Sequence, residues 1–265
     1  MKTYPRVLTI AGSDSGGGAG IQADIKAISA TGGYAASAIT AVTVQNTTGV
    51  YAVHPVPVEI IAAQIAAVIS DIGVDSVKIG MLFSEDVIAA VHAELLKAGV
   101  TNIVLDPVMV ATSGHRLIEE QAIKVLAREL VPIARVITPN IPEAEILAGR
   151  KICSQGELPR IARDLSCGGT VSVLMKAGHL TDDEVVDVFY NAETDRCMEL
   201  RSRRVNSINT HGTGCTLSSA FASFLAQGYA LDDAAIAAKN YITGAISAGA
   251  EFVIGKGHGP VKHFY

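Results

Sequence analysis

The segment 209–216, with the sequence NTHGTGCT, carries the residues with the clearest chemical potential. It opens an Ala- and Ser-rich stretch with helical spacing, so its backbone N–H groups would lie at a helix start. The N–H groups of Gly212, Thr213, Gly214 and Cys215 would converge there and form an anion hole for negative charge on a transferred phosphoryl group. A helix N-terminus also lowers the pKa of a thiol, which makes Cys215 a candidate base or nucleophile.

Carboxylates stand at two further positions where ligands bind in parallel α/β sheets, outside the carboxyl ends of the strands. Asp106 directly follows the apolar run Ile103–Leu105, and a buried carboxylate there needs a divalent metal or a cationic residue as its partner. Glu143 stands three residues after Asn140, and oxygens so placed suit Mg²⁺. Two alternatives stay open, because Asp106 can cap the following turn and Asn140 can form a capping pair with Glu143 without metal.

Lys176 is the basic residue of this set. It ends the apolar run Val171–Met175, and an ammonium at a buried strand end is costly unless it meets an anion. Phosphate is the natural candidate, and a carboxylate of the protein is the alternative.

Two polar turns lie nearer the N-terminus. The Gly-rich turn 11–20, AGSDSGGGAG, lets backbone approach a phosphate, but it matches neither GxGxxG nor a P-loop, so a tight strand-to-helix turn is the alternative. Gln45 follows an apolar run, and its carboxamide offers the donor and acceptor that an amino-pyrimidine or pyridine edge requires. An ordinary polar turn is the alternative, and the local sequence alone favours it.

The elements that must position these residues alternate along the chain. Short β-branched runs are each followed by a segment with helical spacing, which is typical of parallel βα units and predicts a doubly wound α/β sheet. The predicted strands are Val7–Ala11, Ala38–Val44, Ser76–Ile79, Ile103–Leu105, Val136–Thr138 and Val171–Lys176. The predicted helices are Ala19–Thr31, Val58–Ile72, Glu85–Ala98, Glu119–Leu130, Glu143–Ala148 and Leu158–Leu165.

The pattern changes after Lys176. Glu184–Tyr190 and Arg196–Arg201 are predicted to form a β-hairpin around a turn-rich segment, and helices at Gly212–Ala226 and Leu231–Glu251 close the chain. No linker, charge block or repeat interrupts the sequence, so we expect residues 1–265 to form one domain.

Composition excludes several classes of protein. The 21 Lys and Arg against 26 Asp and Glu give a net charge of -5 without a basic stripe, so no nucleic-acid partner is expected. No uncharged run is long enough to span a membrane, and no signal peptide is expected. The four cysteines lack disulfide or zinc spacing, which favours a reducing cytoplasm. A small buried thiol suits Cys153, Cys167 and Cys197 better than Cys215.

In chain order, these segments resemble the hydroxymethylpyrimidine (phosphate) kinases of thiamine biosynthesis, a branch of the ribokinase-like superfamily. The resemblance covers almost the whole chain. Its motifs are AGSDSGGGAGIQADIK at 11–26, AVTVQNT at 41–47, KIGML at 78–82, DPVM at 106–109, TPNIPEAE at 138–145, MKAGH at 175–179, HGTGCTLSSA at 211–220 and GHGPVKHF at 257–264.

The resemblance implies a three-layer αβα ribokinase-like fold, with a mostly parallel sheet and a hairpin in the C-terminal half. It also implies a kinase that uses ATP and Mg²⁺ to phosphorylate 4-amino-5-hydroxymethyl-2-methylpyrimidine and then its monophosphate. A homodimer is expected, since superfamily members are often dimers.

The same resemblance implies roles for individual residues. Gln45 would bind the pyrimidine edge, and Asp106 and Glu143 would act around Mg²⁺ and its waters. Lys176 would hold ATP phosphate. Cys215 occupies the position at which sugar kinases of the superfamily carry an aspartate base. The ring pocket would be lined by Gly12, Ala19 and Met81, and the anion hole would be formed by Gly212, Thr213 and Gly214.

Three other functions compete with this interpretation. A pyridoxal or pyridoxamine kinase of the same branch, or an enzyme with both activities, would also act on a hydroxymethyl group of a six-membered aza-ring. A non-catalytic sensor of thiamine precursors would keep the pocket without the charged residues. A thiol hydrolase built on Cys215 and His211 is not supported, because no orienting acid is evident in the sequence.

Overall fold

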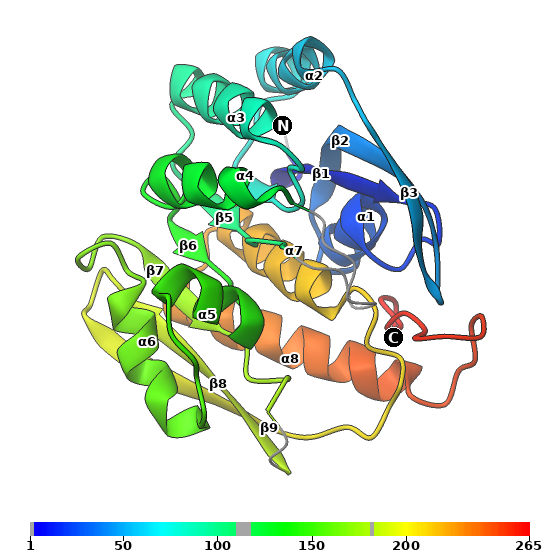
Figure 1. Ribbon diagram of the computed structural model, residues 1–265, viewed down its shortest axis with the longest axis vertical. Helices are drawn as coiled ribbons and strands as arrows, with labels where there is room; N and C mark the ends of the chain where they lie inside the picture. The colour runs from blue at the N-terminus through cyan, green and yellow to red at the C-terminus, as the bar shows by residue number, and fades with distance from the viewer. Residues whose placement is uncertain (1–2, 110–117, 181–182) are drawn as a thin grey trace.

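The computed structural model describes residues 3–109, 118–180 and 183–265. Their strands form a nine-stranded sheet in the order β3-β2-β1-β4-β5-β6-β7-β8-β9 (Figure 1). The six strands from β2 to β7 in that order are parallel, whereas β3, β8 and β9 are antiparallel to their neighbours. The strands are β1 (Arg6–Asp14), β2 (Tyr34–Asn46), β3 (Gly49–Pro55), β4 (Ser76–Ile79), β5 (Ile103–Leu105), β6 (Val136–Ile137), β7 (Ser172–Met175), β8 (Glu184–Asn191) and β9 (Arg196–Arg203).

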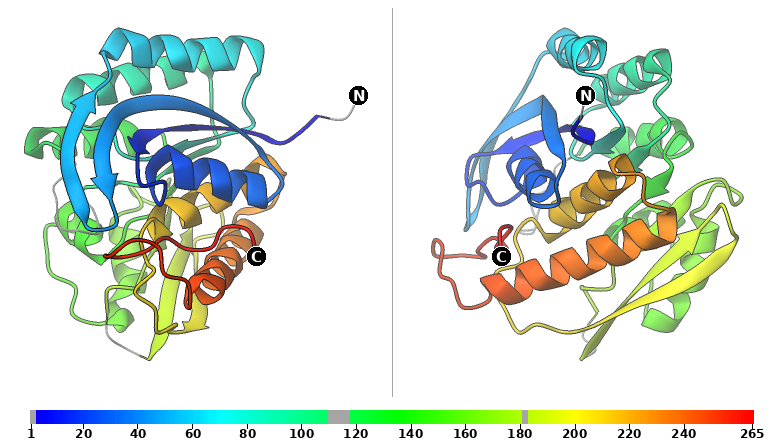
Figure 2. Two further views of the ribbon diagram at one scale, coloured as in Figure 1. Left: turned by 90° about the vertical axis from the view of Figure 1, so that its right-hand side faces the viewer. Right: turned by 180° about the vertical axis from the view of Figure 1, so that it is seen from behind.

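Helices cover both faces of the sheet. Figure 2 shows α1, α7 and α8 together on the face seen from behind, and α2, α3, α4, α5 and α6 lie on the other face. The expected three-layer αβα architecture is therefore confirmed. The helices are α1 (Gly20–Ala30), α2 (Val58–Asp71), α3 (Glu85–Ala98), α4 (Glu120–Val125), α5 (Ile141–Ala148), α6 (Leu158–Asp164), α7 (Thr213–Ala226) and α8 (Leu231–Gly249).

Alternate residues of the central strands enter two separate cores. Leu8 and Ile10 of β1 pack beneath α2 and α3, whereas Val7 packs beneath α7 and α8. Successive side chains of a strand point to opposite faces, so a strand covered on both sides must be apolar at every position. This requirement explains the continuous apolar runs in the sequence.

Several elements agree with the prediction to the residue, namely β4, α3 and β5. The predicted helix Glu119–Leu130 differs, because α4 continues as a π-helical turn, η1 (Leu126–Leu130). A short 3-10 turn, η2 (Gln155–Glu157), precedes α6. The hairpin of β8 and β9 is confirmed.

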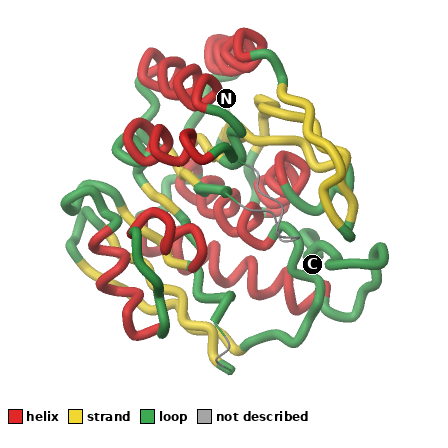
Figure 3. The backbone as a smooth tube through the Cα atoms, in the orientation of Figure 1, coloured by secondary structure: helices red, strands yellow, loops and turns green. Residues whose placement is uncertain are grey.

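One strand was not predicted. β3 pairs antiparallel with β2, which runs on to Asn46, so Gln45 lies within a strand and not in the turn expected after it. Figure 3 shows these two strands side by side at one edge of the molecule, and it shows the chain after α8 running as a loop to the C-terminus. None of the described helices combines the length and apolarity that crossing a membrane requires.

Candidate active site

The carboxyl ends of the parallel strands open into a cavity of about 590 Å³. Every residue predicted from the sequence to belong to the site lines this cavity. It extends from Gln45 on β2, past Asp106 after β5, to Lys176 after β7, with the start of α7 on its wall. The sheet therefore gathers, at one edge, side chains that come from the two ends of the chain.

A cluster of three charged groups occupies the middle of the cavity. Nζ of Lys176 lies 2.7 Å from Oδ1 of Asp106 and 4.0 Å from Oε2 of Glu143. Asp106 also accepts a hydrogen bond from Thr138 Oγ1 at 3.0 Å and one from Ser218 Oγ at 3.3 Å. The sequence left a metal or a cationic residue as the partner of Asp106, and the structure shows Lys176. It left a phosphate or a protein carboxylate as the partner of Lys176, and the structure shows Asp106.

Burial and mutual charge set the protonation of this cluster. Burial raises the pKa of Asp106, but the charges of Lys176 and Lys78 lower it by more, so Asp106 is ionised. Burial raises the pKa of Glu143 to about 7, with Asp106 adding to the rise and Lys176 opposing it. Burial lowers the pKa of Lys176 less than the carboxylates raise it.

Glu143 also forms the capping box that the sequence left open. Its backbone N–H donates to Asn140 Oδ1 at 3.0 Å, and its Oε2 accepts from the Asn140 N–H at 2.9 Å. Two carboxylates in one cavity suit Mg²⁺, which commonly takes one or two protein carboxylates together with substrate phosphates and waters. Among the described residues, no group of three or more His, Cys, Asp or Glu side chains could hold a metal alone. The donor set therefore fits a metal that arrives with a nucleotide.

The start of α7 faces the charged cluster. Gly212 is its N-cap with φ of 77°, and a Cβ at this position would lie 1.8 Å from the Gly18 carbonyl oxygen, so only glycine fits. A Cβ on Gly214 would lie 3.1 Å from Lys176 Nζ. This close approach of backbone to a cation is the arrangement that a bound phosphate requires.

One donor of the predicted anion hole is already occupied. The Thr213 N–H donates to the Thr210 carbonyl at 3.3 Å, so it is not free to bind an anion. The N–H groups of Gly214 and Cys215 have no acceptor within the described part of the chain. The anion hole therefore has fewer free N–H donors than the four predicted from the sequence.

Cys153, Cys167 and Cys197, which the sequence suggested as small buried thiols, are exposed, whereas Cys215 is more buried than they are. The thiol of Cys215 itself also differs from the prediction. Burial raises its pKa to about 11, and the nearby charge of Lys78 only partly opposes this rise. The helix N-terminus was expected to lower the pKa, but loss of water around the thiol has the larger effect. Cys215 is therefore a neutral thiol at pH 7.

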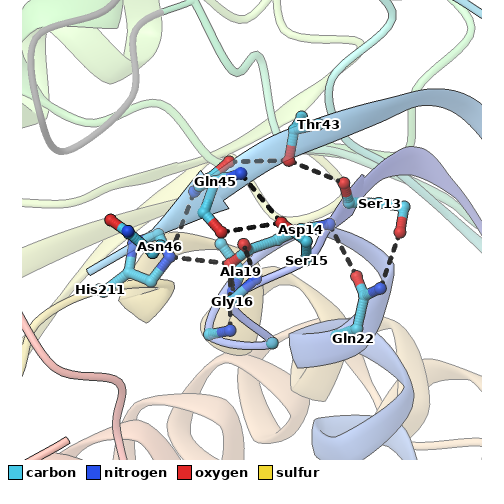
Figure 4. A network of polar contacts seen from close by, with 12 residues as sticks. Ser13, Asp14, Ser15, Gly16, Ala19, Gln22, Thr43, Gln45, Asn46 and His211 are labelled. Atoms are coloured by element: carbon cyan, nitrogen blue, oxygen red, sulfur yellow. Dashed lines mark hydrogen bonds and ion pairs between the residues drawn. The ribbon is translucent and has the colours of Figure 1, made fainter. Parts of the chain in front are cut away.

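Asp14 organises the Gly-rich turn. Its carboxylate accepts hydrogen bonds from three backbone N–H groups, those of Gly16 at 2.7 Å, Gly18 at 3.0 Å and Ala19 at 2.8 Å (Figure 4). Burial raises the pKa of Asp14, but these bonds and His211 lower it by more, so Asp14 is ionised. The glycines thus fold around a carboxylate of the protein, an interaction the sequence analysis did not predict.

His211 links Asp14 to Gln45. Its Nε2 lies 2.9 Å from Asp14 Oδ2 and 3.3 Å from Gln45 Nε2. An ionised carboxylate only accepts hydrogen bonds, so Nε2 of His211 carries the proton and donates it to Asp14. That nitrogen cannot then accept from Gln45, whose amide hydrogens stay available to a ligand in the cavity.

Asp14 also requires the alternative function of a thiol hydrolase, which the sequence did not support, to be considered again. It supplies the acid that was not evident beside His211. However, Nε2 of His211 is committed to Asp14, and the Cys215 pKa of about 11 gives no thiolate for nucleophilic attack. The geometry therefore does not support a hydrolase.

The apolar part of the cavity beside Gln45 is formed by Gly12, Ala19 and Met81. A Cβ on Gly12 would lie 2.5 Å from Met81 Cε, so these two residues are in direct contact. Thr40 Oγ1 fixes the Met81 backbone by donating to its carbonyl at 2.7 Å. The three residues predicted to line a ring pocket thus line this cavity.

A second ion pair, also missed from the sequence, lies beneath α7. Nζ of Lys78 on β4 is 2.9 Å from both carboxylate oxygens of Asp24 on α1, and both side chains are fully buried. Thr9 Oγ1 and Ser219 Oγ also donate to Asp24, at 2.6 and 2.7 Å. The motif KIGML contains Lys78, but nothing in the sequence places its ammonium beside Asp24.

Comparison with known proteins agrees with this geometry. The family model of phosphomethylpyrimidine kinases matches residues 14–262. A hydroxymethylpyrimidine/phosphomethylpyrimidine kinase from Rhizobium meliloti (strain 1021) is 49% identical over 259 residues, which cover 97% of this chain and 96% of that protein.

Two solved structures are similar over nearly the whole fold. The phosphomethylpyrimidine kinase from Clostridium difficile 630 is 44% identical with a TM-score of 0.80, covering 91% of this chain and 99% of that one. An ADP complex of Bacillus subtilis pyridoxal kinase is 34% identical with a TM-score of 0.89, covering 98% of each chain. These matches confirm the ribokinase-like fold. The chain belongs to the phosphomethylpyrimidine kinase family.

Proposed function

We propose that this protein transfers the γ-phosphoryl group of ATP to the hydroxymethyl group of 4-amino-5-hydroxymethyl-2-methylpyrimidine, and then phosphorylates the monophosphate to the diphosphate used in thiamine biosynthesis. The observation that carries the proposal is the single cavity in which Gln45 and the charged cluster of Asp106, Glu143 and Lys176 meet the start of α7. The names of the related kinases agree with it.

The chain's own residues suit this reaction. Gln45 binds the ring edge with its amide hydrogens, and the wall of Gly12 and Met81 holds the ring in place. Lys176 leaves Asp106 to neutralise the phosphate chain, and the free N–H groups of Gly214 and Cys215 bind the transferred phosphoryl group. Asp106 and Glu143 would hold Mg²⁺, which would supply further charge neutralisation when bound with ATP.

In the transfer, the bond between Pγ and the bridging oxygen of ADP breaks while a bond forms from Pγ to the substrate oxygen, whose proton is released to solvent. Cys215 lies at the position of the base in related sugar kinases, but its neutral thiol is a weak proton acceptor. Phosphoryl transfer depends mainly on positioning and charge stabilisation, so a strong base is not required.

The experiment that tests this function is a product assay with ATP, Mg²⁺ and the pyrimidine alcohol. We expect ADP release and the successive appearance of the mono- and diphosphate, resolved by ion-exchange chromatography. Monophosphate alone would remove the second step from the proposal. The absence of ADP with every pyrimidine or pyridine alcohol would instead favour the non-catalytic sensor.

A pyridoxal kinase is the second candidate, because the Bacillus subtilis pyridoxal kinase shares the fold with a TM-score of 0.89. The two functions are separated by turnover of the pyrimidine alcohol and of pyridoxal with wild type and Gln45→Ala. A site that hydrogen-bonds a substrate group rejects analogues lacking it by about 10⁴-fold. We expect the variant to lose pyrimidine turnover, whereas equal losses on both substrates would indicate a dual-activity enzyme.

We also propose that residues 1–265 act as one kinase domain in a cytoplasmic homodimer. Exposed apolar side chains on the ribbon of β2 and β3, those of Val42, Val44 and Tyr51, support a contact between copies. Free cysteines support a reducing compartment. Sedimentation analysis tests the dimer, and a Val44→Lys variant should shift it toward monomer.

A further inference from the structure

A third buried ion pair of lysine and aspartate borders the cavity on the side of β8 and α8. Oδ2 of Asp187 on β8 lies 2.7 Å from Nζ of Lys239 on α8. Asp187 is 5% exposed and Lys239 is 7% exposed, and both line the cavity. Neither residue has a part in the reaction described above.

The other oxygen of Asp187 binds the backbone beside the phosphate-binding lysine. Oδ1 accepts a hydrogen bond from the Ala177 N–H at 2.7 Å, and Ala177 directly follows Lys176. On its other side, the Lys176 N–H donates to the Pro139 carbonyl at 3.0 Å. The turn that carries Lys176 is thus fixed on one side by Pro139, in the segment after β6, and on the other by Asp187 of β8.

Stability alone is a weak reason for this pair. Taking two charges out of water is costly, and well-packed apolar residues of similar volume commonly stabilise a fold equally well. An apolar pair could not, however, accept the hydrogen bond of Ala177. What the ion pair adds is an acceptor at a defined place, held there by Lys239.

The position of the pair also indicates which ligand it serves. Gln45 lies on β2, and the sheet order places β1, β4, β5 and β6 between β2 and β7. The pyrimidine end of the cavity is therefore remote from Asp187. The end near Asp187 is lined by Ile242 and Ile246 of α8 together with Val205, and it adjoins Lys176.

We infer that Asp187, held by Lys239, is a positioning residue for Lys176 that sets the affinity of the protein for the phosphate chain of ATP. Loss of the Ala177 hydrogen bond frees the turn after β7, and the ammonium of Lys176 then spends less time where the phosphates bind. The inference rests on the proposed kinase function.

The test uses the full chain and compares nucleotide affinity with folding. Calorimetry measures binding of the non-hydrolysable ATP analogue AMP-PCP with Mg²⁺, and thermal unfolding is measured on the same samples. The variants are Asp187→Ala, the conservative Asp187→Asn, and a double variant Asp187→Leu with Lys239→Met that leaves no unpaired charge. Glu184→Ala is the matched control, because Glu184 lies on the same strand in an exposed ion pair with Arg201.

Asp187→Ala should weaken AMP-PCP binding about tenfold, the usual effect of losing one hydrogen bond at a charged group, while KM for the pyrimidine alcohol stays unchanged. Asp187→Asn keeps an oxygen for Ala177 and should stay within about threefold of wild type. The double variant should regain much of the lost thermal stability and yet keep the weakened AMP-PCP binding.

Two results would overturn the inference. In the first, AMP-PCP affinity is unchanged in Asp187→Ala. In the second, the double variant restores affinity together with stability, which would make the pair purely structural. Failure of the wild type itself to bind AMP-PCP would overturn the proposed kinase function, and the inference with it.

Discussion

His211 Nε2 donates to Asp14 Oδ2 at 2.9 Å, and this bond joins the segment before α7 to the Gly-rich turn after β1. The two residues are 197 positions apart in the sequence. The same nitrogen lies 3.3 Å from Gln45 Nε2, so the ring that holds the turn also borders the side chain proposed to bind the substrate ring.

His211→Ala should therefore weaken binding of the pyrimidine alcohol about tenfold, because Asp14 loses a donor and the Gly-rich turn at the substrate end of the cavity is held less firmly. AMP-PCP affinity should stay near wild type. Calorimetric titration with each ligand separates the two effects. An equal loss for both ligands would mean that His211 supports the whole cavity and not the substrate end.

Cys215→Ala keeps the backbone N–H groups of the anion hole and removes only the thiol. It should lower kcat by about 10²-fold with AMP-PCP binding intact, the low end of the effect of losing a proton-transfer group. Because the pKa of the Cys215 thiol is about 11, iodoacetamide should alkylate Cys215 slowly at pH 7.5, and exposed Cys153 should react first. Steady-state kinetics and peptide mass spectrometry measure the two effects. An unchanged kcat would remove Cys215 from the catalytic residues.

Lys78→Met should lower the free energy of unfolding by about 3 to 5 kcal/mol, since it leaves the carboxylate of Asp24 buried without its cation. Urea denaturation measures this change. The exposed pair of Arg201 and Glu184 is the control, and Arg201→Met should cost no more than about 1 kcal/mol. A Lys78→Met variant as stable as the control would mean that Thr9 and Ser219 alone satisfy Asp24.

Stability should fall between pH 7 and pH 5 partly because of His263. Burial lowers the pKa of His263 to about 4, helped by the charge of Lys26. In that pH range the unfolded chain binds a proton that the folded chain excludes, so the free energy of unfolding falls as pH falls, by at most about 1.4 kcal/mol per pH unit.

His263→Gln should flatten this dependence while keeping a polar partner for Thr216 Oγ1, which lies 3.0 Å from His263 Nε2. Some dependence should remain, because burial also lowers the pKa of His179. Urea denaturation of both proteins at pH 5 and pH 7 measures the difference. Identical pH profiles would show that His263 is protonated in the folded protein.

The fold was largely predictable because its strands are buried on both faces. β4 and β5 read as uninterrupted apolar runs, and the turns around them mark their ends clearly. β3 was missed because it is an edge strand with exposed positions, such as Tyr51 and His54, and it follows a segment that resembles a turn.

The site was predictable where a charged side chain directly follows a strand. Asp106 and Lys176 follow strands directly, and topology alone brings such positions together. Asp24 and Lys78 lie within a helix and a strand, and only packing of the complete sheet makes them partners. The raised pKa of Cys215 was unpredictable for a similar reason, since burial is a property of the assembled structure.

The Ser219 hydroxyl that donates to Asp24 comes 195 residues later in the chain. During synthesis the N-terminal half of the sheet therefore emerges long before the partners of its buried acids. A nascent chain that stops before His211 holds the carboxylates of Asp14 and Asp24 without His211 and Ser219. One late segment, which contains His211 and the start of α7, brings both the partners of these two acids and the N–H groups proposed to bind phosphate. The fold is therefore completed and the cavity is formed in the same step.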